Sequence, residues 1–114
     1  MSRYMQLTVR VRSYYEKDLE NTYPKLARHL RRIDPNWANQ NPSLYDVAAR
    51  LDILLYRSEG TPFRELFLQY RETLLKLHTS IQESMADWRL SEADQLLYKL
   101  EDIFDEIEEK LTGV

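Results

Sequence analysis

Two long stretches with helical periodicity, joined by a short break, constrain the fold of this chain more than any other feature. In residues 61–88, large apolar side chains recur mostly at steps of three and four: Phe63, Phe67, Tyr70, Leu74, Leu77, Ile81 and Trp88. This spacing places them on one face of an α-helix. Residues 91–112 repeat the pattern with Leu96, Leu100, Ile103, Ile107 and Leu111. Because each apolar face must be buried, the two stretches predict a long helical hairpin.

The boundaries of this hairpin carry residues that favour helix ends. Thr61 can accept a hydrogen bond from an unpaired backbone N–H, and Pro62 suits the first helical position. Ser91 predicts a second helix start, because Asp94 follows three residues later, as in a capping box. Gly113 favours the end of the last helix. The chain is therefore expected to reverse direction near residues 88–90.

The N-terminal part of the chain predicts another long helix. Apolar residues keep a helical register from Tyr4 to Ile33, with Leu7 and Val11 among them. Residues 5–11 also alternate between apolar and polar side chains, but a lone strand there would have no pairing partner, so we expect helix. Pro24 removes a backbone donor without shifting the apolar register, which predicts a kink rather than a break.

A polar loop at residues 34–41 separates this arm from a shorter helix at residues 41–57. The loop contains one proline, one aspartate and three asparagines, which do not continue a helix. Trp37 lies within it, either as a cap on the end of the core or as an exposed anchor of the kind enriched at binding surfaces. Asn41 and Pro42 predict the start of the shorter helix, and Gly60 favours its end.

Together these segments predict an all-α fold, an up-down-up-down four-helix bundle with one short helix and a long C-terminal helical hairpin. With 114 residues, the chain is expected to form a single helical-bundle domain over residues 1–114. No stretch approaches the roughly 20 apolar residues of a membrane span. The chain has no cysteine, and its first residues contain arginines where a signal peptide needs an apolar core, so a cytoplasmic location is expected.

The shorter helix cannot cover the whole hairpin. At about 1.5 Å per residue, residues 41–57 span about 24 Å, whereas residues 61–88 span about 40 Å. Part of the long arms therefore needs another neighbour, which the Trp37 loop or a second chain can supply. The apolar face is also wide at residues 66–68 and 74–75. We therefore expect self-association, with a dimer as the default, or a dedicated protein partner.

The net charge of −3 conceals an asymmetry between the two ends. Residues 1–33 contain eight Lys and Arg against three acids, whereas residues 91–112 contain two lysines against eight acids. The two ends can pair inside the fold through surface ion pairs, each worth about 0–1 kcal/mol. Alternatively, one charged face is presented to a partner.

The pattern of potential ligands predicts neither a metal nor a cofactor. Di-iron sites in helical bundles use Glu-x-x-His pairs, but the residues at that spacing are Leu26 before His29 and Leu75 before His78. The chain also has no glycine-rich phosphate loop. The acidic residues between 101 and 109 fit a solvated helix face better than a catalytic carboxylate pair.

One spacing points to an enzyme. The segment RETLLKLH, from Arg71 to His78, is similar to the Arg-x(4–6)-His pattern of HEPN-type helical ribonucleases. The resemblance implies a histidine for proton transfer and an arginine for the developing charge on the phosphate. It covers eight residues, and the polar residue that usually follows the arginine is Glu72 here. The alternative is that His78 flanks the core, with its imidazole hydrogen-bonded or exposed.

These features favour a small non-enzymatic protein that acts by binding other proteins, as an adaptor, assembly chaperone, inhibitor or complex subunit. Its candidate contacts are the basic segment, the loop tryptophan, the hairpin tip and two adjacent tyrosines: Arg28, Arg31, Arg32, Trp37, Trp88, Tyr14 and Tyr15. An alternative is a nucleic-acid-binding accessory protein that uses the basic N-terminal helix, because clustered arginines can contact phosphates. The negative net charge counts against that alternative.

Overall fold

The computed structural model describes residue 4, residues 8–15 and residues 17–113. Within these residues the predicted all-α fold is confirmed, with eight helices and no strand. The helices are α1 (Leu19–Thr22), α2 (Pro24–Ile33), α3 (Pro35–Ala38), α4 (Leu44–Ala49), α5 (Leu51–Arg57), α6 (Pro62–Leu68), α7 (Arg71–Ala86) and α8 (Leu90–Lys110).

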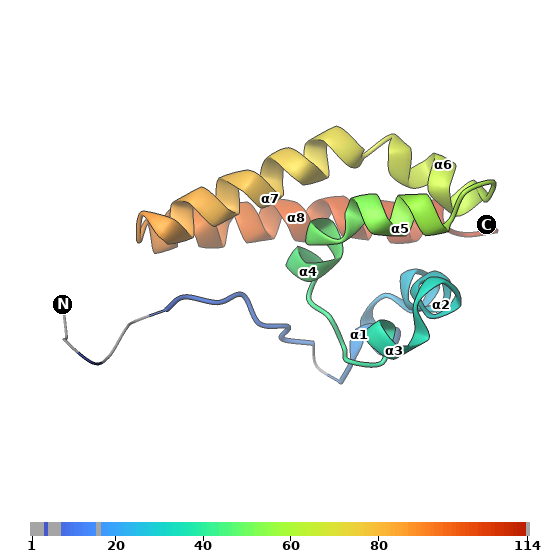
Figure 1. Ribbon diagram of the computed structural model, residues 1–114, viewed down its shortest axis with the longest axis horizontal. Coiled ribbons are helices and arrows are strands. Elements are labelled where there is room, and N and C mark those ends of the chain that lie inside the picture. The colour runs from blue at the N-terminus through green and yellow to red at the C-terminus, as the bar shows by residue number, and fades with distance from the viewer. Residues whose placement is uncertain (1–3, 5–7, 16, 114) are drawn as a thin grey trace.

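The predicted C-terminal hairpin is formed by α7 and α8, which pack side by side along the long axis of the molecule (Figure 1). Their facing surfaces bury Leu74, Ile81, Leu100, Phe104 and Ile107. The molecule measures 52 × 26 × 26 Å along its principal axes. The hairpin helices therefore give the molecule its elongated shape.

Helices α2, α4 and α6 pack against this hairpin, whereas α1 and α3 pack on α2. α4 contacts both α7 and α8, whereas α2 contacts α5 and α8. In Figure 1, α2 is seen nearly end-on, while α5, α7 and α8 lie across the view, so the first arm crosses the other helices. Phe67 of α6 packs in the core between α6 and α8. It is 1% exposed, and its ring centroid lies 4.6 Å from that of Phe63 in α6 and 6.4 Å from that of Phe104 in α8.

The N-terminal arm is not one long helix. Residues 8–15 are not helical, and the first helix of the described chain begins only at Leu19. The helix predicted for residues 8–15 is therefore wrong, and its position Leu7 lies outside the described residues. Asp18 explains the late start, because its side chain accepts a hydrogen bond from Asn21 N and caps α1. We call residues 8–15 the N-terminal strap.

Pro24 breaks the arm instead of kinking it. Tyr23 has φ −131° and ψ 70°, outside the helical region, and Pro24 starts the new helix α2. Tyr23 makes no side-chain cap. Instead, the carboxylate of Glu108 in α8 accepts hydrogen bonds from Lys25 N at 2.8 Å and Leu26 N at 2.9 Å. A carboxylate at this position satisfies unpaired donors and interacts favourably with the helix dipole.

Two predicted helix starts are displaced by a few residues. The third segment begins after Ser43 rather than at Asn41, because Ser43 and Asp46 form a reciprocal capping box. α8 begins at Leu90 without a side-chain cap, so the predicted role of Ser91 as a cap is wrong.

The first arm of the hairpin starts as predicted but is divided. Thr61 Oγ1 accepts a hydrogen bond from Arg64 N at 3.2 Å and caps α6. A turn at residues 69–70 then separates α6 from α7. Gly113 has a positive φ of 83° but lies beyond the end of α8 at Lys110.

Candidate functional site

The N-terminal strap is held against the loop that precedes α4. Ser13 Oγ donates a hydrogen bond to the carbonyl oxygen of Asn41 at 3.1 Å, and Tyr15 OH donates one to the carbonyl oxygen of Pro42 at 2.7 Å. Asn41 Oδ1 also accepts a hydrogen bond from Leu19 N at 2.6 Å. Its φ of 57° is a left-handed conformation that asparagine tolerates better than most residues. Asn41 thus links the strap, the loop and α1.

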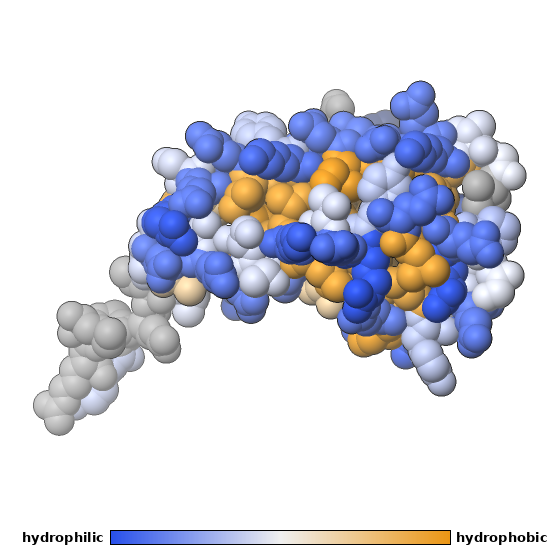
Figure 2. Space-filling model, turned by 90° about the horizontal axis from the view of Figure 1, so that it is seen from above, coloured by the Kyte–Doolittle hydropathy of each residue, from blue (hydrophilic) through white to orange (hydrophobic). Residues whose placement is uncertain are grey.

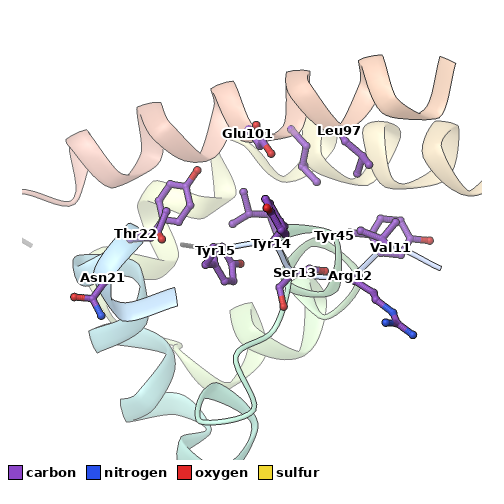
Figure 3. A pocket seen from close by; sticks show the side chains of 14 residues that line it. Val11, Arg12, Ser13, Tyr14, Tyr15, Asn21, Thr22, Tyr45, Leu97 and Glu101 are labelled. Carbon is purple, nitrogen blue, oxygen red and sulfur yellow. The ribbon is translucent and has the colours of Figure 1, made fainter. Parts of the chain in front are cut away.

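A pocket with a volume of about 510 Å³ lies between the strap, α1, α4 and α8 (Figure 3). We call it the strap pocket. Tyr15 of the strap, Tyr23 after α1, Tyr45 of α4 and both Leu97 and Glu101 of α8 line it. Its volume falls within the range of about 300–1,000 Å³ that is typical of ligand sites. The pocket therefore has room for a small organic group.

Specific contacts hold the three tyrosine side chains that wall the strap pocket. Tyr15 makes the hydrogen bond to the loop described above, and Tyr23 OH donates to Asp105 Oδ1 at 2.8 Å. The Tyr45 ring stacks on that of His78, with the centroids 4.4 Å apart. Burial raises the pKa of all three hydroxyls above its ordinary value. The walls are thus neutral aromatic rings in fixed positions.

Glu101 supplies a carboxylate to the strap pocket. Partial burial, followed by the charges of Asp105, Asp102 and Asp94, raises the pKa of Glu101. No hydrogen bond or ion pair joins its carboxylate to another described residue. Arg12 also lines the pocket, but its guanidinium points away from α8 (Figure 3). The negative charge of Glu101 is therefore left without a nearby counter-charge in this part of the structure.

The tip of the hairpin presents a strained and exposed aromatic residue. Trp88 has φ 58°, and its side chain is 53% exposed. Positive φ is a genuine outlier for a bulky side chain. Trp88 borders a second pocket of about 470 Å³ together with Thr8 and Val9 of the strap and Tyr45. Tyr45 lines both pockets, so the hairpin tip and the strap pocket are neighbours. The strap, rather than the Trp37 loop, borders this end of the hairpin.

The predicted basic contacts lie on α2, and none of them lines the strap pocket. The guanidinium of Arg31 donates to both carboxylate oxygens of Glu20 at 2.8 and 2.6 Å, so its charge is paired within the N-terminal arm. Arg28 and Arg32 are exposed on the same helix. The acidic last helix approaches α2 through the backbone cap by Glu108, not through Arg31.

The remaining predicted contacts belong to the strap or border it. Trp37 is half-buried against the core, and the guanidinium carbon of Arg50 lies 4.7 Å from the centroid of its ring. Tyr14 is fully exposed at 100%, whereas the neighbouring Tyr15 is partly buried in the strap pocket wall. The structure thus brings Tyr14, Tyr15 and Trp88 to the strap region. Trp37 borders the strap as well, because it lines a pocket with Val11, Arg12 and Ser13.

The two residues of the ribonuclease-like spacing, Arg71 and His78, interact with different side chains. Arg71 Nε donates to Asp52 Oδ1 at 3.0 Å, and both side chains are exposed. His78 stacks on Tyr45, and burial lowers its pKa more than the opposing charge of Asp46 raises it. The imidazole is therefore mainly neutral near pH 7.

Glu101, Tyr23 and Tyr45 are site residues that the sequence pattern does not single out. Tyr23 carries a usable signal, since a tyrosine in an apolar register brings a hydroxyl that needs a partner once it is buried. Glu101 has no such signal, because it looks like the other acids of α8.

The described part of the chain contains no group of three or more His, Asp or Glu side chains that could hold a metal ion. None of its helices is long and apolar enough to cross a membrane. Comparison with protein-family models, with curated proteins and with solved structures gives no significant match to this chain.

Proposed function

We propose that this chain is a non-enzymatic protein-interaction module that binds a partner protein through the hairpin tip and the adjoining strap. Trp88 is the observation that supports this most directly. The left-handed conformation costs a non-glycine residue on the order of 1–2 kcal/mol. A side chain that is 53% exposed recovers little of this cost through burial. The conformation ends α7, because Arg89 N donates to the carbonyl oxygen of Ser84 at 2.8 Å, but this turn does not require a large aromatic side chain. An exposed indole ring at a position that favours glycine therefore supports a role in binding.

Other exposed apolar side chains lie on the same elements. Leu90 is 46% exposed two residues after Trp88, Tyr98 on α8 is 63% exposed, and Tyr14 on the strap is 100% exposed. Tryptophan and tyrosine bury a large area with few rotatable bonds, which is why they are enriched at binding hot spots. Figure 2 shows apolar surface along the helical body, interrupted by charged side chains. A partner protein would be held by these aromatic anchors.

The two alternative functions have less support. A ribonuclease needs Arg71 and His78 at one open site, but the arginine is paired with Asp52 and the imidazole is stacked on Tyr45. A phosphate-binding surface needs available cations, but Arg31 is paired with Glu20.

Affinity capture with matched variants tests the proposed function. The tagged wild-type chain, Trp88→Gly and Tyr56→Ala are used to capture proteins from a lysate of the native host. Tyr56 is 81% exposed on α5 and serves as the control, because α5 lies away from the hairpin tip in Figure 1. We expect one protein to be captured by the wild type and by Tyr56→Ala but lost with Trp88→Gly. Direct titration of that protein, once purified, should show the same order of affinities.

Sedimentation velocity of the three proteins separates a different partner from a second copy of this chain. A dimer that dissociates in Trp88→Gly would show that the surface serves self-association. If no captured protein and no oligomer depends on Trp88, the proposed function is wrong.

A further inference from the structure

The strap pocket combines aromatic walls with a carboxylate that has no counter-charge. Tyr15 and Tyr23 are fixed by their hydroxyl hydrogen bonds, and Tyr45 is fixed by stacking on His78. Tyrosine rings attract organic cations through their negative faces, most strongly where water is excluded. Rings that are already held in place lose little freedom when a ligand binds.

The charges around the strap pocket also favour a cation. Glu101 lines it, and the carboxylates of Asp46 and Asp105 lie close to its walls. After burial, these three charges are the next causes that raise the pKa of Tyr15 or Tyr23. Asp46 and Asp105 already accept hydrogen bonds from Ser43 N and Tyr23 OH. Glu101 makes no such contact with another described residue. A bound cation would supply the counter-charge that Glu101 lacks.

We propose that the strap pocket binds the side chain of a lysine or arginine that projects from the partner protein. The apolar stem of such a side chain would pack on Leu97 and the tyrosine rings, with its charged end at Glu101. The exposed Tyr14 beside the pocket would contact the flanking backbone of the partner. This inference rests on the proposed function, because it assigns a chemical feature to the partner that Trp88 anchors.

A titration monitored by backbone amide NMR tests the proposal on the full chain. The probes are the capped tripeptides acetyl-Gly-Lys-Gly-amide and acetyl-Gly-Arg-Gly-amide, the neutral analogue with norleucine at the centre, and free butylammonium. We expect a basic peptide to shift the amides of Leu97 and Glu101 with a dissociation constant of about 1 mM, as befits a single side chain. The norleucine peptide should bind at least about fivefold more weakly.

Glu101→Gln and Glu109→Gln form a matched pair of variants on α8. Both glutamates are exposed, but Glu109 does not line the strap pocket. Glu101→Gln should weaken the basic peptide about fivefold or more, whereas Glu109→Gln should leave its affinity unchanged. The amide spectrum of each variant reports whether the fold is intact.

Several outcomes would overturn the proposal: no shifts in the pocket, equal binding of the norleucine peptide, or equal affinity in Glu101→Gln and the wild type. Butylammonium that binds as tightly as the basic peptides would indicate a site for small amines instead of a partner's side chain. The proposed function is tested separately, because a partner that depends on Trp88 but binds Glu101→Gln with unchanged affinity would leave that function standing and refute the pocket assignment.

Discussion

Asn41 and Trp88 share an unusual backbone conformation but differ in what their side chains do. Their φ angles are 57° and 58°. The Asn41 side chain accepts a hydrogen bond from Leu19 N, whereas the Trp88 side chain is 53% exposed. The two residues are therefore expected to respond differently to substitution of their side chains.

We expect Trp88→Gly to be more stable than Trp88→Ala, with a free energy of unfolding about 1 kcal/mol higher. Both variants lose the indole ring, so their difference isolates the strain of a Cβ atom at positive φ. Urea denaturation followed by circular dichroism measures it. Both variants should lose the partner equally, since binding depends on the ring.

Asn41→Gly tests the left-handed residue whose side chain makes a hydrogen bond within the fold. Glycine also accepts the conformation, but the variant loses the acceptor for Leu19 N. We expect it to be less stable than the wild type by about 0.5–1.5 kcal/mol, the usual net value of a hydrogen bond. A stabilised Asn41→Gly would mean that this hydrogen bond does not hold the strap end in place.

His78 is expected to make stability depend on pH. Burial lowers its pKa in the folded state below the ordinary value of 6.5, so the unfolded chain takes up a proton first as the pH falls. Its contribution to stability is fully present above pH 6.5 and is lost as the pH falls through the lowered pKa. In His78→Gln this dependence is absent. The difference in unfolding free energy between wild type and variant should therefore shrink between about pH 8 and about pH 5, and a constant difference would contradict the assignment.

At the scale of elements, the start of α2 depends on a side chain from the other end of the chain. Glu108 provides the cap that Tyr23 does not, through its contacts with Lys25 N and Leu26 N. Replacing a helix cap usually costs about 0.5–2 kcal/mol. We expect Glu108→Ala to lower the free energy of unfolding by this amount, while the exposed neighbour variant Glu109→Ala stays within about 0.5 kcal/mol of the wild type. Thermal unfolding of the two variants side by side checks this.

The elements that could be predicted are those whose determinants are local. The hairpin follows from the apolar repeat and from Thr61 with Pro62, all within the segments that fold together. The break at Pro24 and the strap could not be predicted in the same way. The break is stabilised by Glu108, and the strap is held by the backbone of residues 41–42, so each depends on partners far away in the sequence. Among the described residues of the predicted apolar register, Val11 packs against the core but Tyr14 is fully exposed, so the helical spacing there does not correspond to one buried face.

The strap pocket could not be predicted from local patterns either. Its walls come from the strap, α1, α4 and α8, and its carboxylate is one of several similar acids on α8. Glu101 differs from them because it lines the strap pocket with Tyr15 and Tyr23. Trp88 and Tyr15, by contrast, were among the predicted contacts, because large aromatic residues outside a regular stripe are visible in the sequence alone.

At the scale of the whole molecule, stability is expected to depend on the aromatic cluster at the centre. Phe104 is fully buried and lies beside Phe67, where α6 meets α8. We expect Phe104→Ala to lower the free energy of unfolding by about 3–5 kcal/mol. Tyr98→Ala, on the same helix but 63% exposed, should change stability by less than about 0.5 kcal/mol. Similar losses in the two variants would show that the exposed ring also packs in solution.

The cap of α2 has a consequence for the order of events during synthesis. Lys25 and Glu108 are 83 residues apart, so the ribosome releases the beginning of α2 long before it has made the carboxylate that completes it. The backbone amides of Lys25 and Leu26 therefore lack the Glu108 carboxylate until nearly all of the described chain has emerged. Folding of this small protein is therefore expected to be largely post-translational, with the last helix closing the structure around helices that were made first.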